Sequence, residues 1–583
     1  MKPERDYRAY FLGPKSENQA WVRAEVQSIL GHWFRWRKDL FPDDAPVITT
    51  DERNKAPYLA AREKMAQGLE QLNQLLEEEL PKFTPRYIGH MVSDLALPAL
   101  MGHFAMLLHN PNNTSKDASK IGSVIETEVI AMLAEMLGFD PDRATGHITG
   151  GGTVANFEAV WRARFRQDHW LSLVLFLAEE RSVHMNLFEG AHMGWQRFGE
   201  LVALHSVPVE KLRTYSAVAA NPYEFGERMN TAFGIKYRGP VMLVPENKHF
   251  SWSKASNIFG FGEQAFWPIP LDSMGRADVG ALQKLIEKAS LEHRPITMVV
   301  SVAGTTETGE IDPIDQTQGI LNAALARQSI DIWHHVDAAY GGYLCSMLRG
   351  NKPKVLSTAS AAALSAIGHA HSVTIDPHKL GYVPYSCGAI ITRDKQAYAV
   401  SGFAAPYLER HLDEDKWSTT LEGSRSAAGA AATWLTGKTL GYDGDGIGRV
   451  IADTILAARQ FKRDIEPALP FVHFLTPSET NILCFSVSEP GWSLTKSNQV
   501  TETMFTCFEK CPDFSVSKTT LSGKAHAKMI KHHVRGFEGV LDDDRLVLLR
   551  CVFMNPFWQD AATAQKLTAE ITGLMADWFA KYR

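Results

Sequence analysis

Three successive patterns of apolar and polar residues divide this chain. Up to about residue 110, apolar positions recur at helical intervals in stretches such as 21–36 and 61–80. Beyond that point, short β-branched runs alternate with amphipathic helical runs, and in the last part short strands again alternate with helices. The patterns predict an N-terminal helical arm at 1–110, a large domain at 111–435 and a smaller C-terminal α+β domain at 436–583.

Five apolar runs in the large domain are predicted strands. They are 240–246, 295–304, 330–339, 371–377 and 388–394. Their alternation with helices, one of them capped by Asp278, is typical of a mainly parallel sheet covered on both faces. Ligands of such sheets bind at the carboxyl ends of the strands. His249, Thr305, Asp337 and Lys379 lie at or just after four of these ends, so we expect them to meet there.

A glycine run precedes a long predicted helix. Upstream of it, 119–139 is a predicted amphipathic helix, with Ser119 placed to cap it and Gly138 placed to end it. The glycines at 150–152 allow close approach of an anion, and a helix opening near Thr153 turns its free N–H groups toward that anion. The run predicts a phosphate cradle, with a flexible turn as the alternative. The Walker lysine and the GxGxxG spacing are absent, which argues against a nucleoside triphosphatase or a dinucleotide fold.

Composition narrows the class of protein. The chain has 583 residues, of which 45% are hydrophobic, and a formal net charge of -6 with no basic stripe, so neither nucleic acid nor an anionic membrane is an expected partner. The apolar run at 170–178 is too short to span a bilayer, and the first ten residues lack the apolar centre of a signal peptide. We therefore expect a cytoplasmic protein whose six cysteines are reduced thiols. No metal-ligand spacing occurs, so no metal is expected.

Lys379 stands at the end of an apolar strand, where a buried ammonium would be costly. A lysine kept neutral there can attack a carbonyl and form a Schiff base, which is how pyridoxal phosphate is held. This cofactor also needs a carboxylate beside its pyridine nitrogen, a flat group on one ring face, a phosphate site and a small residue beneath the ring. The candidates are Asp337, His249, Gly152 with Thr153 and with Thr305 or Thr306, and Ala339.

Each candidate also has an ordinary structural alternative. Lys379 could be a surface lysine on a loop, Asp337 a strand-end cap, His249 a half-buried histidine with one hydrogen bond, and Thr305 a turn former. Four such coincidences at successive strand ends favour the cofactor site.

The motifs GGGTVAN, PENKHFSW, HVDAAYGG and TIDPHKLGYVPY, in this order, resemble those of the group II pyridoxal-phosphate-dependent amino-acid decarboxylases. Through GHM, LP, GHFAMLLHNPNN and DPHKLGYVPY, the chain is most similar to bacterial tyrosine decarboxylases, from roughly residue 80 to the end. The resemblance implies an α/β fold of fold type I, like aspartate aminotransferase, with a mainly parallel seven-stranded sheet in the large domain. It also implies pyridoxal 5'-phosphate and a homodimer with shared active sites, in which the arm is a dimerisation segment.

The resemblance assigns roles to single residues. It implies Lys379 as the Schiff-base lysine, Asp337 opposite the pyridine nitrogen and His249 stacked on the ring, with His335 and His378 close by.

For four further sites the resemblance implies a role, but the residues also allow an ordinary structural explanation. Tyr407 resembles the tyrosine that returns a proton to the α-carbon, or it is an exposed loop aromatic. Gly423 and Ser424 resemble residues that reach the phosphate of the neighbouring subunit, or the small residues of their segment, 420–435, serve plain helix packing. Arg550 resembles an arginine that binds a substrate carboxylate, or it forms a structural salt bridge. His90 could meet a substrate ring hydroxyl, or it lies in a helix-to-helix corner.

The expected function is decarboxylation of an L-amino acid to its amine and carbon dioxide, with an aromatic substrate such as tyrosine. A decarboxylase of aspartate or glutamate remains open, because neither His90 nor Arg550 excludes it. An aldehyde synthase or a carbon–carbon lyase is a second hypothesis, and Tyr407 argues against the oxidative aldehyde synthases. A third is a catalytically inactive interaction module, against which Lys379, Asp337 and His249 together argue.

Overall fold

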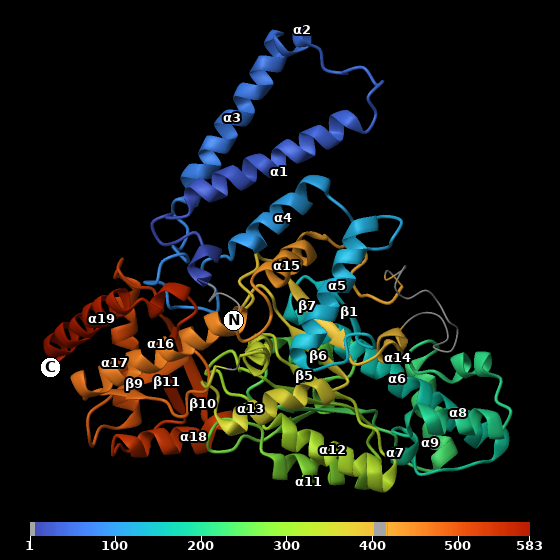
Figure 1. Ribbon diagram of the computed structural model, residues 1–583. Helices are drawn as coiled ribbons and strands as arrows, with labels where there is room; N and C mark the ends of the chain where they lie inside the picture. Colours follow the sequence, from blue (N-terminus) through green and yellow to red (C-terminus); the bar gives the residue numbers. More distant parts are fainter. Residues whose placement is uncertain (1–5, 352, 402–415, 417) are drawn as a thin grey trace.

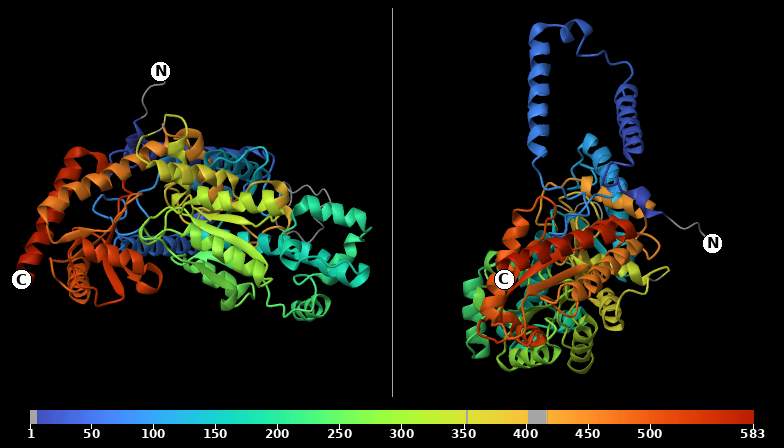
Figure 2. Two further views of the ribbon diagram at one scale, coloured as in Figure 1. Left: turned by 90° about the horizontal axis from the view of Figure 1, so that it is seen from below. Right: turned by 90° about the vertical axis from the view of Figure 1, so that its left-hand side faces the viewer.

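The computed structural model describes residues 6–351, 353–401, 416 and 418–583. An exposed helical arm projects from the rest of the molecule (Figures 1 and 2), formed by α1 (Gln19–Asp39), α2 (Thr50–Arg53) and α3 (Ala56–Leu76). Every residue of α3 is at least partly exposed. The arm is shorter than the predicted 1–110, because α4 (Leu97–His109) buries its first turns against α15 (Ala428–Thr439).

Close packing of α4 on α15 depends on a glycine. A Cβ atom built on Gly102 would lie 2.6 Å from the carbonyl oxygen of Ala431, so only a residue without a side chain permits this approach of the two backbones. The small residues of α15, which include Ala430 and Ala432, are buried in the same contact. The small residues of α15 thus pack against α4, which is one of the two alternatives considered for this segment.

A seven-stranded sheet forms the centre of the large domain and has the order β1-β7-β6-β5-β4-β2-β3. Its strands are β1 (Thr145–Thr149), β2 (Val241–Pro245), β3 (Phe266–Ile269), β4 (Ile296–Val302), β5 (His334–Asp337), β6 (Ser372–Ile375) and β7 (Gly388–Thr392). Only β7 runs antiparallel to its neighbours, so the prediction of a mainly parallel seven-stranded sheet is confirmed. All five predicted runs contain a strand.

Helices cover both faces of this sheet, and successive residues of one strand face opposite layers. Met242 and Val244 of β2 pack with residues of α6 (Gly152–Arg181) and α10 (Phe250–Ile258). Val241 and Leu243 pack instead with α11 (Val279–Leu291) and α12 (Ile314–Gln328). Asp278 caps α11 as expected, since its side chain accepts a hydrogen bond from the N–H of Ala281.

The remaining helices of the large domain are α5 (Lys120–Leu137), α7 (Leu187–Gly190), α8 (Gly194–Leu204), α9 (Pro222–Phe233), α13 (Thr358–Ser365) and α14 (Lys395–Ala399). Helix α5 ends at Gly138 with φ +92°, as expected. Ser119 occupies the N-cap position of α5, as predicted. Its hydroxyl makes no hydrogen bond to the backbone of the helix, so the predicted capping interaction is wrong. The apolar run at 170–178 lies in α6 and is buried in a cluster with α8 and α9. None of the described helices is long and apolar enough to cross a membrane.

The C-terminal part is a smaller α+β domain whose antiparallel sheet has the order β10-β11-β9-β8. Its elements are α16 (Ile447–Ala468), β8 (Val472–Phe474), β9 (Ile482–Val487), α17 (Leu494–Glu509), β10 (Ser517–Ser522), α18 (Gly523–Gly536), β11 (Arg545–Val552) and α19 (Ala561–Tyr582). The predicted boundary at 435/436 falls inside α15, which continues to Thr439. The connection at 440–446 separates α15 from α16.

Buried neutral histidines predict loss of stability in acid. In the described part of the chain, burial lowers the pKa of six buried histidines to about 3 or about 4, namely His147, His192, His334, His335, His371 and His533. The unfolded chain takes up these protons below about pH 6.5, whereas the folded chain resists them, so the free energy of unfolding falls as pH drops from about 6.5 to about 4. We expect a lower urea midpoint at about pH 5 than at about pH 7.

Four carboxyl groups oppose this loss of stability in acid. Burial raises the pKa of Asp94, Asp168 and Asp312 to about 6 and that of Glu310 to about 7, so the folded chain takes up these protons first and gains stability as pH falls through those values. The six histidines outnumber them, which sets the sign of the net effect. A urea midpoint that stays constant or rises toward pH 5 would contradict the prediction.

Candidate active site

A cavity of about 260 Å³ lies at the carboxyl ends of β2, β4, β5 and β6. Its lining contains all four predicted strand-end residues, His249, Thr305, Asp337 and Lys379. The other predicted residues in its wall are Gly152, Thr153, Thr306, Ala339 and His378. These groups meet because the strands that carry them are parallel and end at one edge of the sheet.

Lys379 follows a tight turn at the end of β6. Its backbone N–H donates to the carbonyl oxygen of Asp376, and its Nζ lies 3.1 Å from Asp376 Oδ2. The side chain of Lys379 is 20% exposed, whereas that of Asp376 is 3% exposed. The second oxygen of Asp376, Oδ1, is buried and has no hydrogen-bond partner in the described part of the chain. Sequence reasoning missed Asp376 as a functional group, although it stands three residues before the lysine in the quoted motif.

Asp337 is held by donors from two helices. Its Oδ2 accepts hydrogen bonds from Asn156 Nδ2 at 2.8 Å and from Trp252 Nε1 at 3.0 Å. Its Oδ1 accepts a longer bond from the N–H of Ala339 at 3.3 Å. Donors on both oxygens fix the orientation of the carboxylate toward the cavity. Asn156 and Trp252 also escaped sequence reasoning, although both belong to motifs that it singled out.

His249 and His378 are neutral groups in the cavity wall. Burial lowers the pKa of His249, and the nearby Asp337 carboxylate only partly offsets this. The Nδ1 atom of His249 accepts from the N–H of Ser251 at 3.2 Å, which leaves Nε2 to carry the ring proton. Burial also lowers the pKa of His378, whose Nδ1 accepts from the N–H of Cys387 at 3.1 Å.

His335 lies behind the cavity wall rather than in it. Burial lowers its pKa to about 4, so the ring is neutral. Its Nδ1 lies 2.8 Å from Ser372 Oγ, and its Nε2 lies 3.3 Å from the side-chain oxygen of Asn156, the residue that donates to Asp337. His335 thus supports the residue that orients the aspartate.

The glycine turn at 150–152 brings the backbone close to other groups of the cavity wall, and a side chain at Gly152 would prevent this approach. Gly151 has φ +148°, and a Cβ on Gly152 would lie 2.9 Å from Asp376 Oδ2 and 3.1 Å from Ala339 Cβ. Directly after the turn begins α6, a helix of 30 residues whose N-terminal N–H groups carry partial positive charge. The turn, the helix end and the adjoining cavity with Lys379 and Asp337 therefore fit a phosphorylated aldehyde such as pyridoxal phosphate.

Thr305 lines the cavity, but its hydroxyl is committed to its own turn. Its Oγ1 accepts from the N–H groups of Gly309 and Glu310 and contacts the Glu310 carboxyl group, whose pKa burial raises to about 7. The turn-forming alternative thus describes Thr305 better than a phosphate contact does. Its neighbour Thr306 also borders the cavity.

Neither Arg550 nor His90 is part of the cavity lining, although Arg550 contacts the wall residue Thr306. The Arg550 guanidinium is buried and donates to the carbonyl oxygens of Thr306, Glu307 and Gly89 and to Ser517 Oγ. These partners are three carbonyl oxygens and one hydroxyl, in contrast to the carboxylate that a buried charge led us to expect. The contact with Gly89 positions the segment that carries His90, which is exposed.

The two remaining site residues lie elsewhere. Ser424 is exposed, and its Oγ accepts from Asn112 Nδ2 at 3.1 Å. Gly423 is exposed next to it. Tyr407 lies outside the described residues. The roles implied for these residues therefore stay predictions.

Comparisons with known proteins agree with this chemistry. A family model described as the pyridoxal-dependent decarboxylase conserved domain matches residues 224–488. The L-tyrosine decarboxylase of Levilactobacillus brevis is 31% identical over 83% of this chain and 80% of that protein. The L-tyrosine decarboxylase of Enterococcus faecium is 28% identical over 98% of each protein. Among solved structures, apo mouse CSAD matches 95% of this chain and 98% of its own with a TM-score of 0.62 at 18% identity, which shows the fold alone.

Proposed function

From the premise that this chain belongs to the pyridoxal-dependent decarboxylase family and is a pyridoxal-phosphate-dependent amino-acid decarboxylase, we propose that its substrate is L-tyrosine. The products would be tyramine and carbon dioxide. Support for the substrate comes from the L-tyrosine decarboxylases that resemble this chain over most of their length.

The observation that carries the proposed site is that Lys379 and Asp337 line one cavity. When bound, the cofactor supplies an electron-withdrawing ring that stabilises the negative charge left on the α-carbon after carbon dioxide leaves. Lys379 would hold the aldehyde carbon through Nζ, and Asp337 would keep a proton on the pyridine nitrogen. His249 would cover one face of the ring, which a neutral imidazole does without adding charge.

Asp376 extends this set of residues. Its Oδ2 lies within hydrogen-bond distance of Lys379 Nζ, so it would orient the amine toward the cavity and accept a proton from it. The glycine turn with Thr153 would hold the phosphate. Ala339, whose Cβ borders the turn, would leave space beneath the ring.

Measurement of carbon dioxide release with each of the twenty amino acids tests the substrate proposal. Loaded with cofactor, the enzyme should release carbon dioxide fastest from L-tyrosine and should form tyramine in equal amount. Faster release from aspartate or glutamate would overturn the aromatic assignment. Hydrogen peroxide and an aldehyde in place of the amine would overturn the decarboxylation product.

His90→Leu should reduce discrimination in favour of tyrosine. We propose that the imidazole meets the substrate ring hydroxyl, because Arg550 holds the adjacent Gly89 carbonyl next to the cavity wall. Loss of one such hydrogen bond should lower kcat/KM for L-tyrosine about tenfold. The same variant with L-phenylalanine is the control, because that substrate has no hydroxyl and should show no loss. Equal losses for both substrates would contradict a role at the hydroxyl.

We further propose that two copies of this chain form the active enzyme. Along α3, Met65, Leu69, Leu72 and Leu76 recur at heptad spacing, and each is at least 50% exposed. Such a stripe on a projecting arm fits the surface of a second copy. The exposed Gly423 and Ser424 would then approach the phosphate site of the partner subunit.

Changing the stripe should separate the subunits. Leu69→Lys with Leu72→Lys places two charges on the apolar face of α3, so the mass measured by light scattering should fall from that of two chains to that of one. Gln67→Lys, also exposed on α3, is the matched control and should leave the mass unchanged. A wild-type protein that already behaves as one chain would overturn the proposal.

A further inference from the structure

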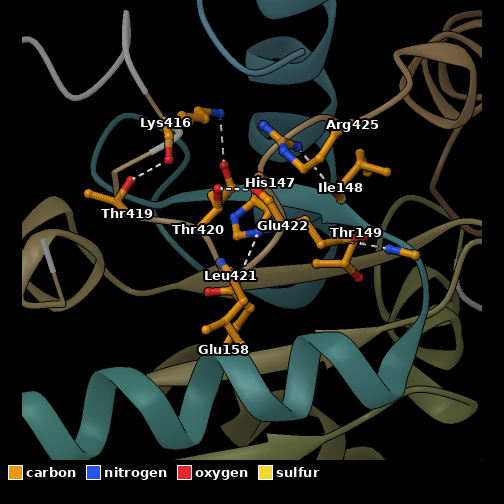
Figure 3. Close-up of polar contacts among 12 residues, drawn as sticks. His147, Ile148, Thr149, Glu158, Lys416, Thr419, Thr420, Leu421, Glu422 and Arg425 are labelled. Atoms are coloured by element: carbon orange, nitrogen blue, oxygen red, sulfur yellow. Dashed lines mark hydrogen bonds and ion pairs between the residues drawn. The ribbon is translucent and has the colours of Figure 1, made fainter. Parts of the chain in front are cut away.

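A buried group of charged side chains, which includes Glu158, Lys416 and Arg425 (Figure 3), has no role in the chemistry described so far. The carboxylate of Glu126 on α5 accepts hydrogen bonds from Lys416 Nζ at 3.2 Å and from Arg425 Nη1 at 2.6 Å. Arg425 also donates to the carbonyl oxygen of Ile148 at 2.9 Å. The two cations flank the segment 418–424, so Glu126 ties both of its ends to the large domain.

Helix α6 holds the middle of the same segment. Glu158 Oε1 accepts from the N–H of Leu421 at 2.6 Å, and Arg162 Nη2 donates to the carbonyl oxygen of Thr419 at 2.7 Å. Both α6 side chains are fully buried. The pairing of charges in this buried group leaves the backbone of residues 419–421 little freedom.

This arrangement places the carboxylate of Glu422 next to the predicted phosphate cradle. Glu422 Oε2 accepts a hydrogen bond from the N–H of Gly150 at 3.2 Å, and its Oε1 lies 3.3 Å from where a Cβ of Gly150 would stand. Thr420 donates from Oγ1 to the Glu422 carbonyl oxygen at 2.7 Å, which fixes the backbone at this point. A negatively charged side chain is thus held at the edge of a site suited to an anion.

We propose that Glu422 sets the affinity for the cofactor by competing with its phosphate group for the N–H of Gly150. Two anions at one helix N-terminus repel each other, so binding of the phosphate requires that the carboxylate move away or gain a proton. A neutral side chain of the same shape removes this cost. The inference rests on the proposed assignment of the glycine turn to the phosphate.

The groups that face Glu422 give the competition a pH dependence. Burial raises the pKa of Glu422, the Gly150 N–H and Arg425 lower it, and the carboxylates of Glu158 and Glu126 raise it further. As pH falls, a larger share of Glu422 is protonated and the competing charge is lost. The wild-type protein should therefore lose affinity for the cofactor, relative to a variant without this charge, as pH rises.

Equilibrium binding to the full-length apoprotein tests the proposal without measuring turnover. Titration with pyridoxal phosphate, followed by absorbance, should give a Kd for Glu422→Gln about three- to tenfold below that of wild type near pH 8. The ratio of the wild-type Kd to that of Glu422→Gln should decrease as the pH is lowered, because a larger share of Glu422 is then protonated. Pyridoxal, which lacks the phosphate, should bind both proteins equally. Glu135→Gln, an exposed change on α5, is the matched control and should bind like wild type.

Each alternative result rejects the competition. An unchanged or higher Kd in Glu422→Gln would make the carboxylate neutral or helpful to binding. A ratio that does not vary with pH, or an equal gain for pyridoxal, would show that charge at the phosphate is not the cause. If wild type bound pyridoxal as tightly as pyridoxal phosphate, the glycine turn would not hold the phosphate, and that assignment would fail with the inference.

Discussion

Lys379→Ala is expected to lower kcat by about 10³-fold or more, because the cavity lining, as far as the structure describes it, holds no second amine that could replace the covalent anchor of the cofactor. The variant should still bind pyridoxal phosphate through the glycine turn and Asp337, although more weakly. Borohydride should reduce the imine bond of the wild-type protein, so that its visible absorbance band is lost and the cofactor stays attached to the chain, whereas the variant should release its cofactor after the same treatment.

Lys254→Ala provides the control for this experiment. Lys254 is exposed on α10, close in sequence to His249, and its removal should leave both turnover and the borohydride reaction unchanged. A Lys379→Ala protein whose cofactor stayed attached to the chain after borohydride treatment would show that another amine forms the bond. That result would overturn the site as proposed.

Asp337→Asn is expected to lower kcat about 10²- to 10³-fold while leaving the cofactor bound. Asparagine has the same shape but lacks the negative charge that would hold a proton on the pyridine nitrogen. Both carboxylate oxygens of Asp337 accept hydrogen bonds, Oδ2 from Asn156 Nδ2 and Trp252 Nε1 and Oδ1 from the N–H of Ala339, so the amide nitrogen of asparagine would replace one of the two acceptors. Single-turnover rates on fully loaded enzyme measure the chemical step separately from binding.

Asp278→Asn is the matched control, because Asp278 caps α11 away from the cavity and asparagine caps helices equally well. It should leave kcat unchanged. A wild-type single-turnover rate in loaded Asp337→Asn would contradict the role of the carboxylate. If the variant could not be loaded with cofactor, Asp337 would instead be needed to hold the cofactor.

Strands with few apolar residues escaped the sequence analysis. The strand β1 reads TGHIT and β10 reads SKTTLS, so neither forms an apolar run, and β3 contains Pro268 and pairs only along one side at the sheet edge. In contrast, β2 and β4 are buried along their whole length and were evident as apolar runs. Pattern reading therefore found the centre of the sheet and missed its edges.

Side-chain partners were harder to foresee than positions. Thr305 was expected to reach a phosphate, but a glutamate five residues later engages its hydroxyl. Arg550 was expected to have a carboxylate partner and instead has carbonyl partners, because the turn at 306–307 and the chain at Gly89 present their oxygens to it. A residue's type restricts which partners it accepts, but packing determines which of them comes within reach.

The sequence by itself determined the cofactor chemistry and the fold class. A buried strand, a strand-end residue and a glycine turn are local features, and each of them is specified by the few residues of one motif. Only the tertiary structure decided that Asp376 lies beside Lys379 Nζ, that two helices orient Asp337, and that Glu422 reaches Gly150. The last contact joins residues 272 positions apart. Such contacts depend on how whole elements pack, and no pattern within one element specifies that packing.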